Sequence, residues 1–470
     1  MQPKQQKDGQ SMLFTSRLEQ ILNDQHPLYK LAGTIEWSEF DSTMGKLYDP
    51  GFGRPAKPTR LMIGLHYLKY TYNLSDEAVV EGWIENPYWQ YFCGEQYFQH
   101  EFPIDPTSMT KWRNRVKDSG KEKLLEQTIR AGLKTGTLKQ HQLKRLVADT
   151  TVQEKAIAFP TDARLYHRMR SKLVKKAQQC GIELRQSYRR VAKRAFVMQH
   201  RFAHARQFKK ADKQIRKLKT YLGRITRDIE RKIASCPRLQ QEFSGLLDTS
   251  HRLLSQKRDS KNKLYSIEAP EVNCISKGKA HKRYEFGCKV GLVSAAGNAF
   301  IVGAVAFEGN PYDGHTLKDT LTQTMMLLGK TRLGDVYTDD GYKGHGCGDI
   351  ADVHIVKRGW RKLPAGIRRW YSRRSMIEPV IGHCKSDYRM DRNYLKGVKG
   401  DKINAILSAC GFNIRKLLRK ILFVFHRMAY AITICRKIPA VDANYFCPII
   451  LLTKKLLFQG RLNSRHQAAA

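Results

Sequence analysis

Apolar residues recur at helical spacing in the first third of the chain. The clearest repeat is Leu61, Met62, Leu65 and Leu68. Steps of three and four residues place these side chains on one face of a helix. Ser75 precedes a second apolar repeat, and serine is a favoured N-cap because its hydroxyl accepts a free backbone N–H. With a third helix expected over 109–116, residues 1–135 are predicted to form a helical N-terminal domain.

The pattern changes to that of strands at residue 145. A β-branched, apolar run covers 145–152, and a hairpin is expected from 284–293 and 299–307. Short strands at 336–338 and 353–356 alternate with helices at 316–328 and 368–389. Strands mixed with helices in this order favour an α/β fold in which helices pack on a mixed sheet.

A long helical pattern interrupts the strands between about 162 and 260. Its apolar positions are Leu218, Tyr221, Leu222, Ile225, Ile229 and Ile233, again three and four residues apart. We expect a helical hairpin inserted in the sheet domain. The predicted organisation is therefore a helical domain (1–135), the first part of the core (136–161), the insertion (162–265), the rest of the core (266–425) and an atypical tail (426–470).

The net charge of the chain limits the kinds of molecule that it is expected to bind. Lys plus Arg is 84 and Asp plus Glu is 43, a net charge of +41. A polyanion is the simplest partner for such a surplus, with nucleic acid first and an anionic membrane surface second. The most apolar stretches are far shorter than the roughly 20 residues of a membrane span, so we expect no membrane partner. The N-terminus has no apolar signal sequence, and ten cysteines without a CxxC pair favour a reduced cytoplasm.

Two basic segments are candidates for nucleic-acid contacts. From Arg164 to Arg258 there are 27 Lys or Arg against six Asp or Glu. This single-signed excess indicates either a DNA-backbone-binding hairpin or a solvated one. The helix at 109–116 carries Lys111, Arg113 and Arg115, as the reading helix of a helix-turn-helix does, although the helices of a packing domain have a similar pattern.

Three carboxylates stand at positions suited to a metal site. Asp149 lies inside the first strand, where an acidic residue is costly unless it is paired or binds a cation. Asp339 ends a strand just before a glycine turn, and Glu378 lies in the last predicted helix. Carboxylates that converge from neighbouring strands and a covering helix suit Mg²⁺, which keeps several waters and binds substrate phosphates.

Cations and a phenol surround Glu378 in the sequence. Tyr371, Arg374 and Lys385 lie seven before, four before and seven after it, on one face of a continuous helix. Arg389 and Arg392 extend that stripe. A carboxylate among cations suits a phosphate that lies on a metal site. Pro379 favours a kink in this helix, since it removes a backbone hydrogen bond.

These motifs resemble those of the DDE transposases of bacterial insertion sequences. Tyr371-x2-Arg374-x3-Glu378-x6-Lys385 is similar to their Y-R-E-K signature, and 149–152 to their first catalytic motif. Residues 337–342 resemble the second. The segments 277–279, 284–287 and 309–317 are similar to the insertion-sequence-five branch. The resemblance runs from about Tyr48 to Leu422, with the motifs in order.

The resemblance implies a ribonuclease-H-like catalytic core. It implies that Asp149, Asp339 and Glu378 are the catalytic, metal-binding triad, holding two Mg²⁺ ions that Mn²⁺ can replace. Asp339 is chosen over Asp340 because one residue separates the family's Asp from Gly-Tyr. Tyr371, Arg374, Lys385 and Arg389 are expected to contact DNA, and Asp313 and His315 to border the site.

The function expected from the resemblance is transposition. The protein would cleave DNA at terminal inverted repeats and transfer the strands into target DNA, as a homodimer when bound to DNA, in the cytoplasm with the nucleoid. Two alternative functions stay open. A decayed, non-catalytic DNA-binding protein would need no triad, and a metal-dependent nuclease would need no strand transfer. An RNA-binding role ranks last, because no RNA-module signature is present. The segment after about Ile438 departs from the family pattern.

Overall fold

The computed structural model describes residues 16–48, 55–257, 259–276, 282–356 and 359–437. The chain divides into two compact units. Unit 1 joins Met1–Leu143 to Ala409–Ala470, and unit 2 is Lys144–Ser408. The predicted tail after Ile438 lies outside the described residues.

Unit 1 is helical, as the sequence predicts. Its helices are α1 (Leu18–Ile21), α2 (Pro27–Thr34), α3 (Ser38–Met44), α4 (Thr59–Thr71), α5 (Asp76–Glu85), α6 (Pro87–Phe92), α7 (Thr107–Arg115) and α8 (Asp118–Lys134). The expected cap is present: the Ser75 hydroxyl accepts the Ala78 N–H at 3.0 Å. Helix α4 is buried on nearly every face, because the other helices of the unit surround it.

The last helix, α16 (Gly397–Lys437), continues from unit 2 into unit 1. Within unit 1, Asn413 donates to the Thr128 hydroxyl of α8 at 3.1 Å, and both side chains are buried. An added Cβ at Gly411 would lie 2.9 Å from the Tyr70 backbone, so glycine permits the close approach of α16 to α4. The C-terminal part of the chain thus completes the core of the N-terminal unit.

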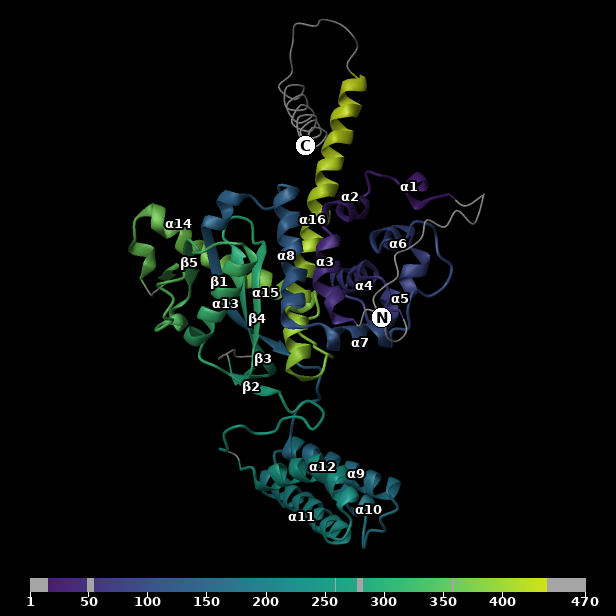
Figure 1. Ribbon diagram of the computed structural model, residues 1–470. Helices are drawn as coiled ribbons and strands as arrows, with labels where there is room; N and C mark the ends of the chain where they lie inside the picture. Colours follow the sequence, from purple (N-terminus) through teal and green to yellow (C-terminus); the bar gives the residue numbers. More distant parts are fainter. Residues whose placement is uncertain (1–15, 49–54, 258, 277–281, 357–358, 438–470) are drawn as a thin grey trace, which may run out of the picture. The chain divides into compact units, whose positions relative to one another are not determined.

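Unit 2 contains a six-stranded mixed sheet (Figure 1). The strands are β1 (Arg145–Glu154), β2 (Asn273–Ser276), β3 (Tyr284–Ala295), β4 (Ile301–Phe307), β5 (Asp335–Thr338) and β6 (Asp352–Ile355). Their order is β2-β3-β1-β5-β6, and β4 also pairs with β3. β1 is antiparallel to β3 and parallel to β5, and β5 is parallel to β6. The predicted mixed sheet is confirmed, with β2 as an additional strand.

Close contacts between backbones fix the centre of the sheet. At Gly287 of β3 an added Cβ would lie 1.9 Å from the Gln153 carbonyl oxygen of β1, so this strand pair has no room for a side chain. Helix α13 (Asp313–Leu327) packs on β3 and β4, where Gly303 leaves room for the Thr324 hydroxyl. Helix α15 (Ile377–Ser386) contacts β1 and β3.

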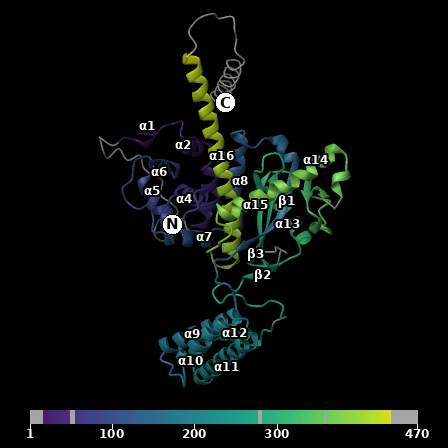
Figure 2. The same ribbon diagram turned by 180° about the vertical axis from the view of Figure 1, so that it is seen from behind.

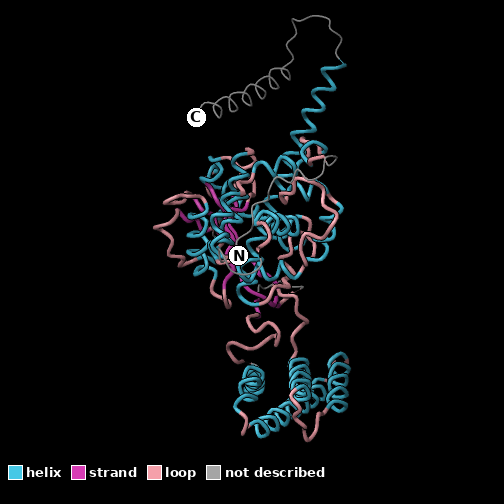
Figure 3. Tube along the Cα trace, turned by 45° about the vertical axis from the view of Figure 1, so that its right-hand side comes forward, coloured by secondary structure: helices cyan, strands magenta, loops and turns pink. Residues whose placement is uncertain are grey.

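The insertion is a bundle of four helices rather than the expected hairpin. They are α9 (Asp162–Gln179), α10 (Arg189–His204), α11 (Phe208–Ile233) and α12 (Pro237–Ser255). Figure 3 shows these segments as helices and loops without strands. The predicted apolar positions Leu218, Leu222, Ile225, Ile229 and Ile233 are buried with residues of α9, α10 and α12 in a core of their own. Turns at 180–188 and 205–207 break the basic segment into more helices than its periodicity indicated.

In the part of the chain that the structure describes, no helix has both the length and the apolar character needed to cross a membrane. Eight cysteines between Cys93 and Cys410 are free thiols, five of them buried.

Candidate active site

Asp149 lies in β1 beyond the last residue that pairs with β5. Arg145, Leu146 and Val147 pair with Asp335, Val336 and Tyr337, and the parallel ladder then ends. The Asp149 carboxylate accepts the Thr150 N–H at 2.7 Å and is 17 % exposed. Asp149 therefore lies in the middle of β1, where the pairing with β5 has ended while the pairing with Leu292 of β3 continues.

Asp339 lies at the same end of the β1–β5 pairing. It follows β5 directly and is two residues beyond Tyr337, as Asp149 is two beyond Val147, so both residues lie just past the end of the β1–β5 pairing. The Asp339 carboxylate accepts the Gly341 N–H at 3.0 Å and caps a short 3₁₀ turn over Asp340–Tyr342. Ligand sites in open α/β sheets form at such carboxyl ends, where the chain leaves a strand in opposite directions.

Asp340 differs from its neighbour. Its carboxylate is half-exposed and pairs with Lys343 at 3.0 Å. A Cβ added at Gly341 would instead lie 3.1 Å from Asp339 Oδ1 and 3.8 Å from Asp313 Oδ2. Asp339 and Asp313 therefore share one small space.

Asp313 begins α13 and is held from the β1 and β3 strands. Its Oδ1 accepts the Thr150 hydroxyl at 2.7 Å and pairs with the buried Lys289 ammonium at 2.9 Å. Lys289 also donates to the Pro311 carbonyl at 2.6 Å. The expected border residue Asp313 is thus bonded to Thr150, the neighbour of Asp149 in β1, whereas His315 is exposed and contacts the Tyr312 ring.

Tyr342 lies at the centre of this group. It is 1 % exposed. Burial, followed by the negative charges of Asp149, Asp313 and Asp339, raises the pKa of its phenol well above the ordinary value. The phenol of this buried residue is therefore neutral. The sequence analysis does not predict Tyr342, Lys289 or Thr150 as site residues. For Lys289, the signal in the sequence is a lysine inside an apolar strand.

Glu378 reaches the group through Arg374. The Arg374 guanidinium lies 2.9 Å from a Glu378 oxygen and 3.9 Å from Asp149 Oδ2. Glu378 itself is 58 % exposed, while Arg374 is mostly buried. A positive charge at this position therefore contacts a carboxylate from β1 and one from α15 together.

The predicted continuous helix over 368–389 is wrong. The chain forms α14 (Ala365–Arg373), a 3₁₀ turn over Arg374–Met376, and then α15, which can be followed in Figure 2. Pro379 explains the break, because a proline is tolerated in the first turn of a helix and disrupts a helix interior. Because of this turn, the side chains of Arg374 and Glu378 have a different relative direction from the one that a straight helix would give them.

The remaining residues of the signature have separate surroundings. Tyr371 packs edge-on against Tyr337 of β5, with ring centroids 5.9 Å apart. Lys385 points to β3, where it pairs at 3.1 Å with Glu285, a carboxylate that is 3 % exposed. Arg389 has a positive φ of 65° and lies over the Tyr394 ring. The structure thus brings Arg374 to the carboxylates and directs Lys385 to a structural ion pair.

Helix α7 of unit 1 carries the three other expected DNA contacts. Lys111 and Arg115 are exposed. Arg113 is 4 % exposed and pairs with Asp76 through both terminal nitrogens, at 2.8 and 2.6 Å. The expectation for Arg113 is therefore corrected: its fork is occupied by a carboxylate inside the unit.

The donor set fits a divalent cation in its chemistry. Carboxylate oxygens are the ligands that Mg²⁺ prefers, and Asp149, Asp339 and Glu378 supply them from three elements. Among the described residues, no three His, Cys, Asp or Glu side chains are gathered closely enough to enclose an ion. The neutralising charge between Asp149 and Glu378 is that of Arg374.

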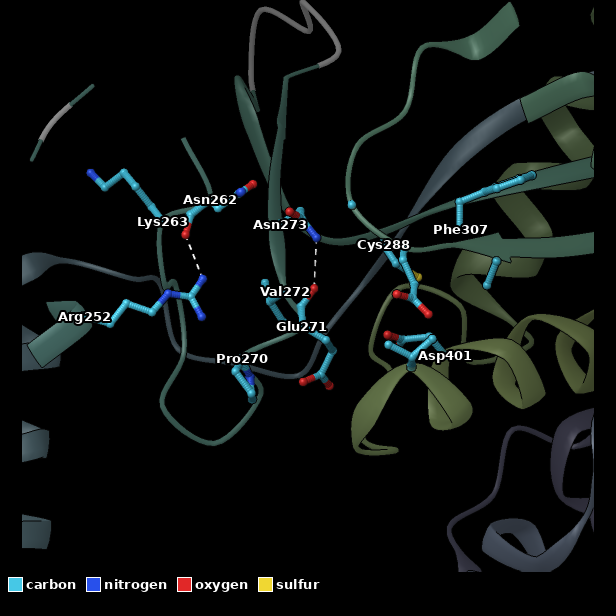
Figure 4. A pocket seen from close by; sticks show the side chains of 14 residues that line it. Arg252, Asn262, Lys263, Pro270, Glu271, Val272, Asn273, Cys288, Phe307 and Asp401 are labelled. Carbon is cyan, nitrogen blue, oxygen red and sulfur yellow. Dashed lines mark hydrogen bonds between the residues drawn. The ribbon is translucent and has the colours of Figure 1, made fainter. Parts of the chain in front are cut away.

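A cavity of about 360 Å³ lies elsewhere in unit 2 (Figure 4). Its acidic walls, Glu271 and Asp401, flank the buried Lys155 ammonium at 2.8 and 2.7 Å. Burial raises the pKa of Asp401, and Asn393 donates to the same carboxylate at 2.6 Å. None of the candidate residues lines this cavity. Its charged groups link the end of β1 to the start of α16 through the Lys155–Asp401 ion pair.

Comparison with known families agrees with this arrangement. A family model described as "Transposase domain (DUF772)" matches residues 16–115. A second, "Transposase DDE domain", matches residues 260–414, which include Asp339, Asp313 and the Arg374–Glu378 pair. The two matches together support a DDE transposase.

A curated relative shares much of this sequence. The transposase is 54 % identical over 208 residues to an uncharacterized protein, ORF8 in the nfe locus of Rhizobium meliloti. The match covers the whole relative and 44 % of the transposase. No solved structure matches the chain. The insertion bundle and Asp149 lie outside both family matches.

Proposed function

We propose that this transposase cleaves DNA strands at the terminal inverted repeats of an insertion sequence of the insertion-sequence-five branch, and transfers the freed ends into target DNA. The observation that carries the proposal is the position of Asp149 and Asp339 at one edge of adjacent strands, with Glu378 linked to Asp149 through Arg374. The strand pairing around β1 supports a ribonuclease-H-like core.

In this proposal, Asp149, Asp339 and Glu378 hold two Mg²⁺ ions, and Mn²⁺ can replace them. When bound, such ions activate a water or a 3′-hydroxyl and stabilise the leaving oxygen of a phosphodiester. Asp339 is preferred to Asp340 because it lies with Asp313 at Gly341, whereas Asp340 pairs with Lys343.

The chain's other groups orient these carboxylates. The Thr150 hydroxyl and the Lys289 ammonium fix Asp313, and the Tyr342 side chain is buried. Arg374, which neutralises Asp149 and Glu378 in the absence of substrate, can donate its planar fork to a DNA phosphate. Its position beside the carboxylates supports the proposal that it contacts a phosphate next to the reacting bond.

The DNA contacts that we propose outside this group are Tyr371, Arg389, Lys111 and Arg115. Lys385 and Arg113 have carboxylate partners inside their units, and we assign them structural roles. The partners are double-stranded inverted repeats and target DNA. A homodimer on the DNA would hold two element ends, and the nucleoid would be the place of action.

A glutamate-to-glutamine change tests the site. Glu378→Gln should abolish Mg²⁺-dependent cleavage of a labelled inverted-repeat duplex and leave affinity for that duplex unchanged. Glu101→Gln, a matched change at an exposed glutamate of unit 1, should keep both. Cleavage by Glu378→Gln at the wild-type rate would overturn the assignment of Glu378.

A further inference from the structure

The insertion bundle has a strongly basic surface around a core of its own. Its helices α9–α12 enclose the buried apolar residues described above, so the polar residues of the segment lie outside. Their balance is 27 Lys or Arg against six Asp or Glu from Arg164 to Arg258. Neither family match covers the bundle, and the sequence leaves open whether it binds DNA or is only solvated.

A concavity of about 480 Å³ opens on this surface, between the loop that precedes α10 and one face of α11. It is lined by Arg185, Gln186, Tyr188, Arg224, Arg227, Asp228, Glu230 and Arg231. We call it the arginine pocket. Arg224, Arg227 and Arg231 follow one another at three- and four-residue steps, so they share a face of α11, opposite the buried Leu222, Ile225 and Ile229.

The two acidic residues of the pocket already have partners. The Asp228 carboxylate accepts the Arg185 N–H at 3.0 Å and lies 3.5 Å from the Arg231 guanidinium and 4.0 Å from the Lys232 ammonium. Glu230 pairs with His251. Asp228 therefore holds Arg185, Arg231 and Lys232 together, and its single negative charge offsets only part of theirs.

Arg224 and Arg227 carry the surplus charge. Among the described residues, neither makes an ion pair with a carboxylate, and both are exposed. Arg224 donates to the Tyr188 hydroxyl at 3.4 Å and lies over that ring. The ring is held in turn by stacking on Tyr221, with centroids 4.8 Å apart. The wall of the pocket is thus fixed, and two guanidinium groups face solvent beside it.

The chemistry of the pocket suits phosphodiesters. A guanidinium binds phosphate oxygens with two parallel N–H bonds, and several such groups together favour an anion that carries repeated charges. A volume of about 480 Å³ is in the range of sites for small organic ligands, which admits a segment of backbone. Arginines and one tyrosine dominate the lining, and such groups bind phosphates without reading base sequence.

We propose that the arginine pocket binds the phosphate backbone of DNA, independently of sequence, and so gives the transposase a second point of attachment besides its catalytic unit. The inference rests on the proposed function in taking DNA as the substrate. It goes beyond that function by assigning a ligand site to the insertion.

The test compares two double variants of the full-length protein. Arg224→Gln with Arg227→Gln removes the surplus charge, and Lys209→Gln with Lys213→Gln removes equal charge from exposed positions nearer the start of α11. Affinity for two unrelated duplexes is measured against salt concentration. The pocket variant should lower the slope of log affinity against log salt by about 1.8 on both duplexes, at about 0.9 for each phosphate that the variant no longer neutralises. The Lys209/Lys213 variant should keep the wild-type slope.

Three results would overturn the proposal: a pocket variant that binds as the wild type does, an effect on one duplex alone, or an effect on an RNA duplex that is missing on DNA. Circular dichroism of each variant establishes that the bundle still folds. Arg224→Lys with Arg227→Lys should restore part of the affinity, since charge returns without the planar fork.

The same preparations separate this inference from the proposed function. Wild-type cleavage of the inverted repeat, with no effect of the pocket variant on binding, would overturn the pocket and leave the transposase site standing. Pocket-dependent binding without cleavage in Mg²⁺ or Mn²⁺ would support the pocket and contradict the proposed cleavage.

Discussion

Asp339 and Asp340 are adjacent in the chain but have different surroundings, which makes them a matched pair. Asp339 lies with Asp313 at Gly341, whereas Asp340 pairs with Lys343 near the surface. We expect Asp339→Asn to lose strand cleavage by several orders of magnitude and Asp340→Asn to stay within a few-fold of wild type. Single-turnover cleavage of a labelled duplex checks both. The reverse result would assign the site to Asp340.

Single residues were predicted from the sequence where a local pattern decides their position. Asp149 and Asp339 end or interrupt strand patterns, and both lie just past the end of the β1–β5 pairing. Arg113 and Lys385 could not be predicted, because their partners Asp76 and Glu285 are far away in the sequence. A basic residue has the same pattern whether it faces DNA or a buried carboxylate.

At the scale of elements, the β1–β3 pair depends on a glycine. Gly287→Ala would bring a Cβ to within 1.9 Å of the Gln153 carbonyl oxygen, so the two strands must separate. We expect destabilisation of at least about 1–3 kcal/mol, as for an overpacked core. Urea unfolding followed by tryptophan fluorescence and circular dichroism measures it.

The control is Gly245→Ala in α12, where an added Cβ meets nothing within 4 Å. This change should stabilise the helix by about 0.5–1 kcal/mol, because alanine restricts the unfolded chain. Equal unfolding midpoints for Gly287→Ala and wild type would contradict the close contact of β1 with β3.

The buried histidine of α4 predicts a pH dependence of unit 1. Burial, with the nearby Arg113 charge, lowers the pKa of His66 from 6.5 to about 3, against smaller raising effects from Met62 and Asp76. Between these values the unfolded chain binds a proton that the folded unit does not. With respect to His66, unit 1 therefore has its full stability above pH 6.5, and its free energy of unfolding decreases as the pH falls towards about 3.

Unfolding midpoints between pH 7 and 4 test this expectation. His66→Gln should flatten the dependence, and His141→Gln, at an exposed position, should leave it as in wild type. An unchanged slope in His66→Gln would show that other groups cause the loss of stability.

Elements with long apolar periodicity were predicted well. Helix α4, strand β1 and the β3–β4 hairpin lie where the pattern placed them. The number of helices in the insertion was not predicted, and the kink expected at Pro379 is a full break at the 3₁₀ turn Arg374–Met376. Both depend on short polar turns, and such turns leave the apolar period on either side unchanged.

At the scale of the whole molecule, the net charge of +41 predicts strong salt dependence of DNA binding. Each phosphate that the protein neutralises should lower log affinity by about 0.9 for each log unit of salt. Titrations of a labelled duplex at salt concentrations from about 50 to about 200 mM measure this slope. A flat response would remove the argument from charge.

The division into units could be predicted only in part. The helical domain and the sheet domain follow the change of pattern near residue 145, but the sequence pattern did not indicate that 409–437 belongs with the N-terminal unit. That association depends on Asn413 and Gly411 meeting α8 and α4, which are distant from them in the sequence.

The central claim is that Asp149 takes part in metal-dependent cleavage of DNA. The most direct measurement incubates purified wild type and Asp149→Asn with a labelled duplex that carries the element's own inverted repeat, in Mg²⁺ and in Mn²⁺. We predict cleavage at the repeat end by wild type in either metal, and none by Asp149→Asn, with equal duplex binding by both. Tight binding without cleavage by wild type, or cleavage by Asp149→Asn at the wild-type rate, would contradict the account.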